Sequence, residues 1–210
     1  MDETKSKICS EVDSLSDALF DISQYLLDNP ETAYQEVKAC EHLSEKMEGF
    51  GFQVEKGVGN VETAFLARPS GCRPSRPTVA ILAEYDALPK IGHGCGHNLI
   101  GAGAMGAALA IKHLMEEKHI PGTLRVYGAA AEETEGAKVF MAREGLFNDL
   151  EIFLICIFAW LQQQTYERVI FIPFAMVEFS LIDHQIRVDE GDQFVCGTLE
   201  HRTGKTHADG

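Results

Sequence analysis

Two buried apolar runs, each followed by acidic residues and then by a helical pattern, constrain the fold of this chain most. The first run covers residues 78–83 and precedes a pattern rich in glycine and alanine over 99–115. The second covers 123–131 and precedes a helical pattern over 135–144. Alternation of buried strands with helices of this length is typical of α/β proteins. We therefore predict an α/β fold with a largely parallel sheet and helices on both of its faces.

The residues before the first run predict further helices and strands. Apolar residues recur at helical spacing over 7–27, and Asp28-Asn29-Pro30 ends this helix because proline disfavours the α region for the residue before it. The other predicted elements are a helix over 31–48, strands over 52–55 and 63–67, and a polar loop over 68–76.

The charge balance excludes some classes of partner. The chain carries 18 basic and 32 acidic residues, which gives a formal net charge of −14 at pH 7. This excess of negative charge opposes binding to phosphate backbones and anionic membranes, so we predict no nucleic-acid or membrane partner. The acidic start lacks the apolar segment of a secretory signal, and the six cysteines are scattered, which favours free thiols and a cytoplasmic location.

Residues 84–97, at the end of the first apolar run, carry a dense set of reactive side chains. Ligands of open α/β sheets bind beyond the carboxyl ends of the strands. Cys95 and His97 are two residues apart, a spacing that can present a thiolate and an imidazole to one zinc ion. The alternative is a small buried cysteine beside a histidine that hydrogen-bonds a loop carbonyl. His93 lies close by and shapes the loop.

Acidic residues complete the predicted site. Asp86 can orient a ligand histidine through its second ring nitrogen, or it can cap the turn before Pro89. Glu132 and Glu133 leave the second apolar run side by side, and a nearby cation would relieve their mutual repulsion. One of this pair could ligate a metal while the other removes a proton from water. The alternative is a solvated strand end with charges that favour a helix start.

Four short motifs occur in order along the first 150 residues. They are Asn29-Pro30-Glu31, Asp86-Ala87-Leu88-Pro89, Gly94-Cys95-Gly96-His97-Asn98 and Ala131-Glu132-Glu133-Thr134-Glu135-Gly136. Together they resemble the amidohydrolase branch of the aminoacylase and carnosinase family of zinc metallopeptidases. The resemblance implies that residues 1–150 form the N-terminal part of a zinc-peptidase catalytic domain.

The resemblance also implies an activity and a role for each site residue. It implies hydrolysis of dipeptides that carry Lys, Orn or Arg at the C-terminal side, a repair activity alongside carnosine synthesis. Cys95, His97 and Glu133 are implied as metal ligands, Glu132 as the general base, and Asp86 as a further residue of the catalytic site. The implied cofactor is zinc in a two-metal site, with manganese or cobalt as alternatives, and family members form homodimers.

The chain departs from the family pattern after Leu150. Family members have a ligand histidine soon after this point, then a lid and dimerisation domain, and then a last ligand histidine. Residues 151–160 contain no histidine, and residues 151–210 form an apolar and then polar tail. We therefore expect a truncated form that lacks the lid domain. The side chains that could replace the missing ligands are His184, His201, His207 and Cys156.

Two alternatives to an active metallopeptidase stay open. One is a catalytically silent chain that acts as an interaction partner or is an unstable product, because an apolar tail that cannot complete the sheet leaves an exposed patch. The other is a thiol hydrolase that uses Cys95 with His97, since residues two apart on a turn can meet.

Overall fold

The computed structural model of the chain describes residues 3–155. These residues form a five-stranded sheet and the helices that flank it. In chain order the elements are α1 (Glu3–Ser14), α2 (Ser16–Asp28), α3 (Val37–Gly49), β1 (Phe52–Lys56), the 3₁₀ turn η1 (Val58–Asn60), β2 (Phe65–Pro69), β3 (Thr78–Glu84), α4 (His97–Lys118), β4 (Thr123–Ala129), α5 (Ala137–Arg143) and β5 (Ile152–Ile155).

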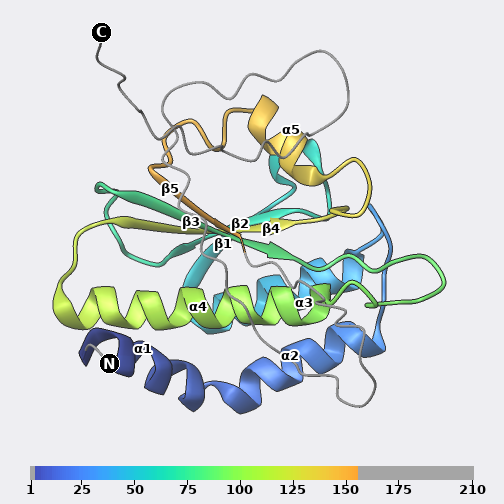
Figure 1. Ribbon diagram of the computed structural model, residues 1–210. Helices are drawn as coiled ribbons and strands as arrows, with labels where there is room; N and C mark the ends of the chain where they lie inside the picture. The colour runs from blue at the N-terminus through green and yellow to red at the C-terminus, as the bar shows by residue number, and fades with distance from the viewer. Residues whose placement is uncertain (1–2, 156–210) are drawn as a thin grey trace, which may run out of the picture.

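The sheet is mixed in its pairing but largely parallel in direction. Its strand order is β1-β2-β4-β3-β5 (Figure 1). β3 is parallel to β4 and to β5, whereas β2 is antiparallel to both β1 and β4. Because two antiparallel steps restore the direction, β1 runs with β3, β4 and β5, and only β2 is reversed. The predicted α/β fold with a largely parallel sheet is confirmed.

Helices cover both faces of the sheet, also as predicted. α3 and α4 lie against one face, α1 and α2 lie outside α4, and α5 lies on the opposite face (Figure 1). α4 follows β3 and α5 follows β4. The chain therefore leaves these two neighbouring strands toward opposite faces, and in sheets of this kind ligands bind at such a point, beyond the carboxyl ends of the strands.

The core lies mainly between the sheet and α4. β3 and β4 are buried over most of their lengths, which explains why their sequences are continuous apolar runs. α4 approaches the end of β3 closely, because a Cβ atom on Gly101 would lie 3.0 Å from the backbone oxygen of Glu84. Gly101 therefore sets the distance between α4 and the strand end where the predicted site begins.

The prediction of a single helix over 7–27 is wrong, because the structure has two helices that are separated at Leu15. The amide of Leu15 donates to the carbonyl of Val12 at 3.0 Å, a tighter turn than that of an α-helix. α1 and α2 both contact α4. The break allows both short helices to follow the same long helix.

The second helix begins at Val37 and not at residue 31 as predicted. The carbonyl of Glu31 accepts a hydrogen bond from the amide of Ala87 at 2.8 Å, and Thr32 forms a bridge with the same residue. Tyr34 has a φ of 61°, outside the helical region. The local pattern could not reveal this conformation, because Ala87 is distant in the sequence.

The predictions for residues 156–210, including the four replacement ligands, lie outside the described residues. β5 continues the sheet past Leu150 by pairing with β3. The division of the chain at residue 150 stays a prediction. Among residues 3–155, no helix combines the length and the apolar character that crossing a membrane requires.

Candidate metal centre

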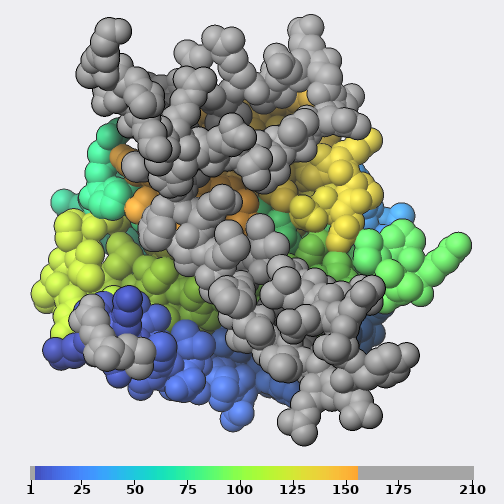
Figure 2. Space-filling view, in the orientation of Figure 1, coloured from blue at the N-terminus to red at the C-terminus, as the bar shows by residue number. Residues whose placement is uncertain are grey.

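The predicted site residues meet at the carboxyl ends of β3 and β4. The loop after β3 carries Asp86 and Cys95, His97 is the first residue of α4, and the segment after β4 carries Glu132 and Glu133. In the space-filling view the green loop and the yellow segment lie at the same edge of the molecule (Figure 2). The structure thus brings together all five residues that the sequence singled out.

Tight turns in the loop after β3 position Cys95 and His97. Leu88 and Gly92 exchange two backbone hydrogen bonds, and the amide of Gly96 donates to the carbonyl of His93. Gly96 immediately precedes α4 with a φ of 85°, a left-handed conformation that glycine adopts without steric cost. The turn at Gly96 directs the side chains on either side of it toward the same space.

The carboxylate of Asp86 fixes the orientation of the buried His97 ring. Its Oδ1 atom lies 2.9 Å from Nδ1 of His97. The other ring nitrogen, Nε2, lies 3.8 Å from Glu84 Oε2, 3.7 Å from Glu132 Oε2 and 3.8 Å from Glu133 Oε1. Nε2 therefore points into a group of three carboxylates, where a cation would find both an imidazole and negative charge.

Two overlapping groups of side chains have the geometry of a metal site. Ligand atoms of Cys95, His97 and Glu133 all lie within 4.8 Å of one another, and so do those of Glu84, His97 and Glu132. A thiolate, an imidazole and a carboxylate are the donor set that zinc prefers. The residues present therefore fit a divalent cation, and the first group is the one that the sequence predicted as ligands.

Asp86 contacts all three residues of that first group. Besides its bond to His97, its Oδ2 atom accepts a hydrogen bond from the amide of Glu133 at 3.0 Å. Its carbonyl oxygen accepts a hydrogen bond from the thiol of Cys95 at 3.8 Å. The two side-chain contacts hold His97 and Glu133 in the way that orients ligands for a metal, and they agree with the predicted orienting role of Asp86. The Cys95 contact requires the protonated thiol and would be lost when the thiolate binds a cation.

The protonation states of the site depend on burial and on the carboxylates. Burial raises the pKa of the Cys95 thiol to about 11, and the charges of Glu133 and Asp86 act in the same direction. Burial alone would lower the pKa of His97, but its hydrogen bond to Asp86 and the charges of Asp86 and Glu84 raise it overall. Burial opposes ionisation of Asp86, yet the bonds from His97 and Glu133 lower its pKa.

Three residues that contact the site or its backbone were given no role by the sequence, namely Glu84, Lys138 and Glu36. Nζ of Lys138 lies 2.8 Å from Glu84 Oε1 and 3.1 Å from Glu132 Oε1, so a partly buried ammonium joins these carboxylates. Glu84 directly follows the first apolar run and begins the stretch 84–97 that the sequence singled out, but no role was predicted for it. Lys138 in α5 and Glu36 before α3 gave no local signal, because their partners lie on other elements.

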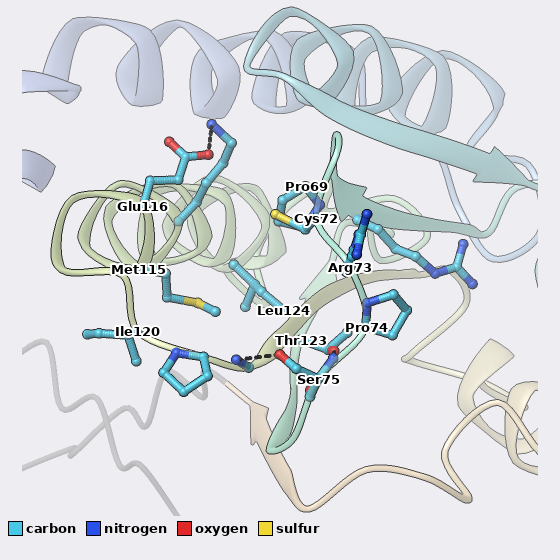
Figure 3. Close-up of a pocket in the computed structure, with 14 residues that line it drawn as sticks. Pro69, Cys72, Arg73, Pro74, Ser75, Met115, Glu116, Ile120, Thr123 and Leu124 are labelled. Atoms are coloured by element: carbon cyan, nitrogen blue, oxygen red, sulfur yellow. Dashed lines mark hydrogen bonds and ion pairs between the residues drawn. The ribbon is translucent and has the colours of Figure 1, made fainter.

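Other notable features lie apart from this centre. A cavity of about 240 Å³ lies at the opposite end of the sheet, between the loop after β2 and the start of β4 (Figure 3). Cys72, Arg73 and Met115 line it, and no metal-type cluster among the described residues includes them. His93 is buried near the site but belongs to neither cluster, and its role in shaping the loop stays a prediction.

Comparisons with known proteins identify relatives in both sequence and fold. The chain is 39% identical over 148 residues to a component of the p-aminobenzoyl-glutamate hydrolase of Escherichia coli, and the match covers 62% of this chain and 30% of that protein. It is 32% identical over 157 residues to the mouse Xaa-Arg dipeptidase, and this match covers 70% of this chain and 36% of that protein. The chain thus spans about a third of the length of these curated relatives.

The fold also matches solved structures. One is the YXEP protein of Bacillus subtilis, described as a dinuclear metal binding peptidase, with a TM-score of 0.56 and 24% identity. The match covers 68% of this chain and 43% of that one. The family model for peptidase family M20/M25/M40 matches residues 80–193, which is more than half of the chain. The chain therefore belongs to peptidase family M20/M25/M40.

Proposed function

We propose that this chain belongs to a metal-dependent hydrolase that cleaves the amide bond of dipeptides with a basic C-terminal residue. The observation that carries the proposal is the convergence of Cys95, His97 and Glu133 within 4.8 Å, with Glu132 beside them. The resemblance to Xaa-Arg dipeptidase supports Arg as the C-terminal residue. We include Lys and Orn because their side chains carry the same charge. A repair activity linked to carnosine synthesis fits this choice.

Cys95, His97 and Glu133 would hold the cation, which we propose to be zinc, with manganese and cobalt as alternatives. When bound, the cation would polarise the amide carbonyl and make water more acidic. Asp86 keeps Nε2 of His97 directed toward the site and holds the backbone of Glu133. These contacts limit the reorganisation that the ligands would need when the cation binds.

Glu132 is the proposed general base. Its Oε2 atom lies 3.7 Å from Nε2 of His97, and its Oε1 atom is held by Lys138 at 3.1 Å. One oxygen is thus anchored while the other faces the site, where it can accept a proton from water and then transfer it to the leaving amine. Such proton transfer typically contributes about 10²- to 10⁴-fold to the rate.

The substrate test compares a substrate with a basic C-terminal residue and one with an acidic C-terminal residue. The name of the mouse relative specifies arginine, whereas that of the E. coli relative specifies glutamate. We expect the full chain to hydrolyse beta-alanyl-lysine faster than p-aminobenzoyl-glutamate, with loss of turnover in a chelator and in Glu132→Gln. Faster turnover of p-aminobenzoyl-glutamate would contradict the proposed specificity. Turnover that survives the chelator would contradict the metal.

A catalytically silent chain is the second candidate, and one observation favours it. The two clusters share His97, whose single free ring nitrogen cannot ligate two cations. Residues 3–155 therefore supply a more complete donor set for one cation than for two. Stoichiometric metal without turnover of either substrate would support this candidate.

The thiol-hydrolase alternative is disfavoured. A thiol with a pKa of about 11 is protonated near neutral pH. Asp86 orients His97 as the third group of such a hydrolase would, but Nε2 of His97 faces the carboxylates of Glu84, Glu132 and Glu133. A cation is the group that would deprotonate Cys95. Homodimer formation and a cytoplasmic location stay predictions.

A further inference from the structure

Glu36 is a fully buried carboxylate that precedes α3. Its Oε1 atom accepts a hydrogen bond from the amide of Ala131 at 2.8 Å. Its Oε2 atom accepts a hydrogen bond from the hydroxyl of Thr63 at 3.0 Å. Its exposed fraction is 0%, and a buried carboxylate is costly unless hydrogen bonds compensate it. Both oxygens of Glu36 have such a partner, and one of the partners leads directly to the metal centre.

That partner, Ala131, immediately precedes Glu132 and Glu133. It has a φ of 57°, a left-handed conformation that costs a residue with a side chain about 1 kcal/mol or more. Its carbonyl accepts a hydrogen bond from the amide of Gly136, which closes the turn that carries both glutamates. A conformation of this kind persists only where surrounding contacts enforce it, and the bond from Glu36 is such a contact.

The segment 131–133 is held at both ends by buried carboxylates. Glu36 accepts the amide of Ala131, and Asp86 accepts the amide of Glu133. Between these two anchors, the side chain of Glu132 is directed to Lys138. The backbone of the proposed base and of one proposed ligand is therefore fixed by two residues on other elements.

The connection that contains Glu36 also supports the loop after β3. The carbonyl of Glu31 accepts the amide of Ala87 at 2.8 Å, next to Asp86. One short segment, residues 31–36, thus contacts the backbone on both sides of the site. Through these two hydrogen bonds, the segment links the loop after β3, which carries Asp86, to the segment after β4, which carries Glu132 and Glu133.

We infer that Glu36 is a positioning residue of the metal centre, which sets the backbone of Glu132 and Glu133 through its bond to Ala131. This inference rests on the proposed metal site. It assigns to residues 31–36 a role in the site that the helical pattern of the sequence concealed. Loss of a group that orients metal ligands typically lowers metal affinity by about 10- to 100-fold.

The test is titration of the full chain with Co²⁺, followed by the absorption band that a cobalt–thiolate bond at Cys95 produces. Glu36→Asp keeps the charge, but it is shorter by one methylene, so its carboxylate is withdrawn from the amide of Ala131. Glu36→Gln keeps an acceptor for Ala131 and can donate to Thr63. Leu43→Ala, which removes a buried side chain of α3 outside the site, controls for lost stability.

We expect Co²⁺ affinity to fall about tenfold or more in Glu36→Asp. Glu36→Gln and Leu43→Ala should bind Co²⁺ within about threefold of the wild type, since both leave the bond to Ala131 in place. Wild-type affinity in Glu36→Asp would overturn the positioning role and leave the metal centre intact. A wild-type chain that binds no Co²⁺ would overturn the metal centre itself.

A second measurement needs neither metal nor a folded variant. In the wild-type chain, hydrogen exchange at the amide of Ala131 should be slow, because this amide is bonded to a buried acceptor. Exchange of the Ala131 amide at the rate of an unprotected peptide would overturn the inference even where Glu36→Asp fails to fold.

Discussion

Oδ1 of Asp86 lies 2.9 Å from Nδ1 of His97, and this contact determines which ring nitrogen faces the carboxylates of the site. Both residues are buried, so solvent does not compete with the bond. The second oxygen of the same carboxylate holds the amide of Glu133. One side chain therefore sets the geometry of two proposed ligands on two different elements.

Asp86→Asn should weaken metal binding by about 10- to 100-fold. The amide preserves the shape of the side chain, but it lacks the charge that raises the pKa of His97 and can accept through one oxygen only. Isothermal titration with Zn²⁺ measures the effect. Glu135→Gln is the matched control, because it removes an exposed carboxylate from the turn after β4 and should bind as the wild type does. Equal affinities in Asp86→Asn and Glu135→Gln would contradict the orienting role.

Metal binding should release protons and strengthen as the pH rises. Cys95 has a pKa of about 11, so near neutral pH its thiol must lose about one proton to become a ligand. Because the pKa of His97 is raised, His97 also carries a proton at lower pH, and metal binding then releases that proton as well. Titrations in buffers of different ionisation enthalpy count these protons. Cys95→Ser should release about one proton fewer, whereas Cys72→Ser, at an exposed loop position, should match the wild type. Release that is unchanged in Cys95→Ser would exclude the thiol as a ligand.

Lys138→Met should destabilise the metal-free chain by about 2 kcal/mol, because it leaves the buried Glu84 carboxylate beside Glu132 without a cation. A divalent cation should then restore more stability to the variant than to the wild type, since it can replace the lost ammonium. Urea unfolding with and without Zn²⁺ measures both effects.

Lys56→Met is the control for the loss of an ion pair. Lys56 pairs with Glu41 at the surface, where both side chains are about half exposed, and its loss should cost less than about 1 kcal/mol. Equal costs for the two lysine variants would show that Lys138 acts as an ordinary surface charge.

Gly101→Ala and Gly103→Ala should change stability in opposite directions, although both lie in α4. A Cβ atom at position 101 would meet the backbone oxygen of Glu84 at 3.0 Å, whereas a Cβ atom at 103 would meet nothing within 4 Å. We expect Gly101→Ala to cost about 1–3 kcal/mol by forcing α4 from the end of β3. Gly103→Ala should gain up to about 1 kcal/mol from helix propensity. Thermal unfolding measures the change in stability of each variant. A stabilised Gly101→Ala would show that α4 has room to move.

The sequence by itself determined the elements and the residues whose signals are local. Continuous apolar runs predicted β3 and β4, and small residues predicted a helix close to the sheet. Reactive residues at the ends of those two runs predicted which side chains would meet, because the carboxyl ends of neighbouring parallel strands share one edge. Asp86, Cys95, His97, Glu132 and Glu133 were found in this way.

Tertiary structure alone decided the features that depend on partners distant in the sequence. The break at Leu15 arises because two helices follow α4, and residues 31–36 leave the helical region because Glu31 bonds Ala87. Glu36 and Lys138 gain their importance from contacts with Ala131 and with Glu84. A hydrogen bond or ion pair between separate elements has no periodicity along the chain, so only the packing of those elements reveals it.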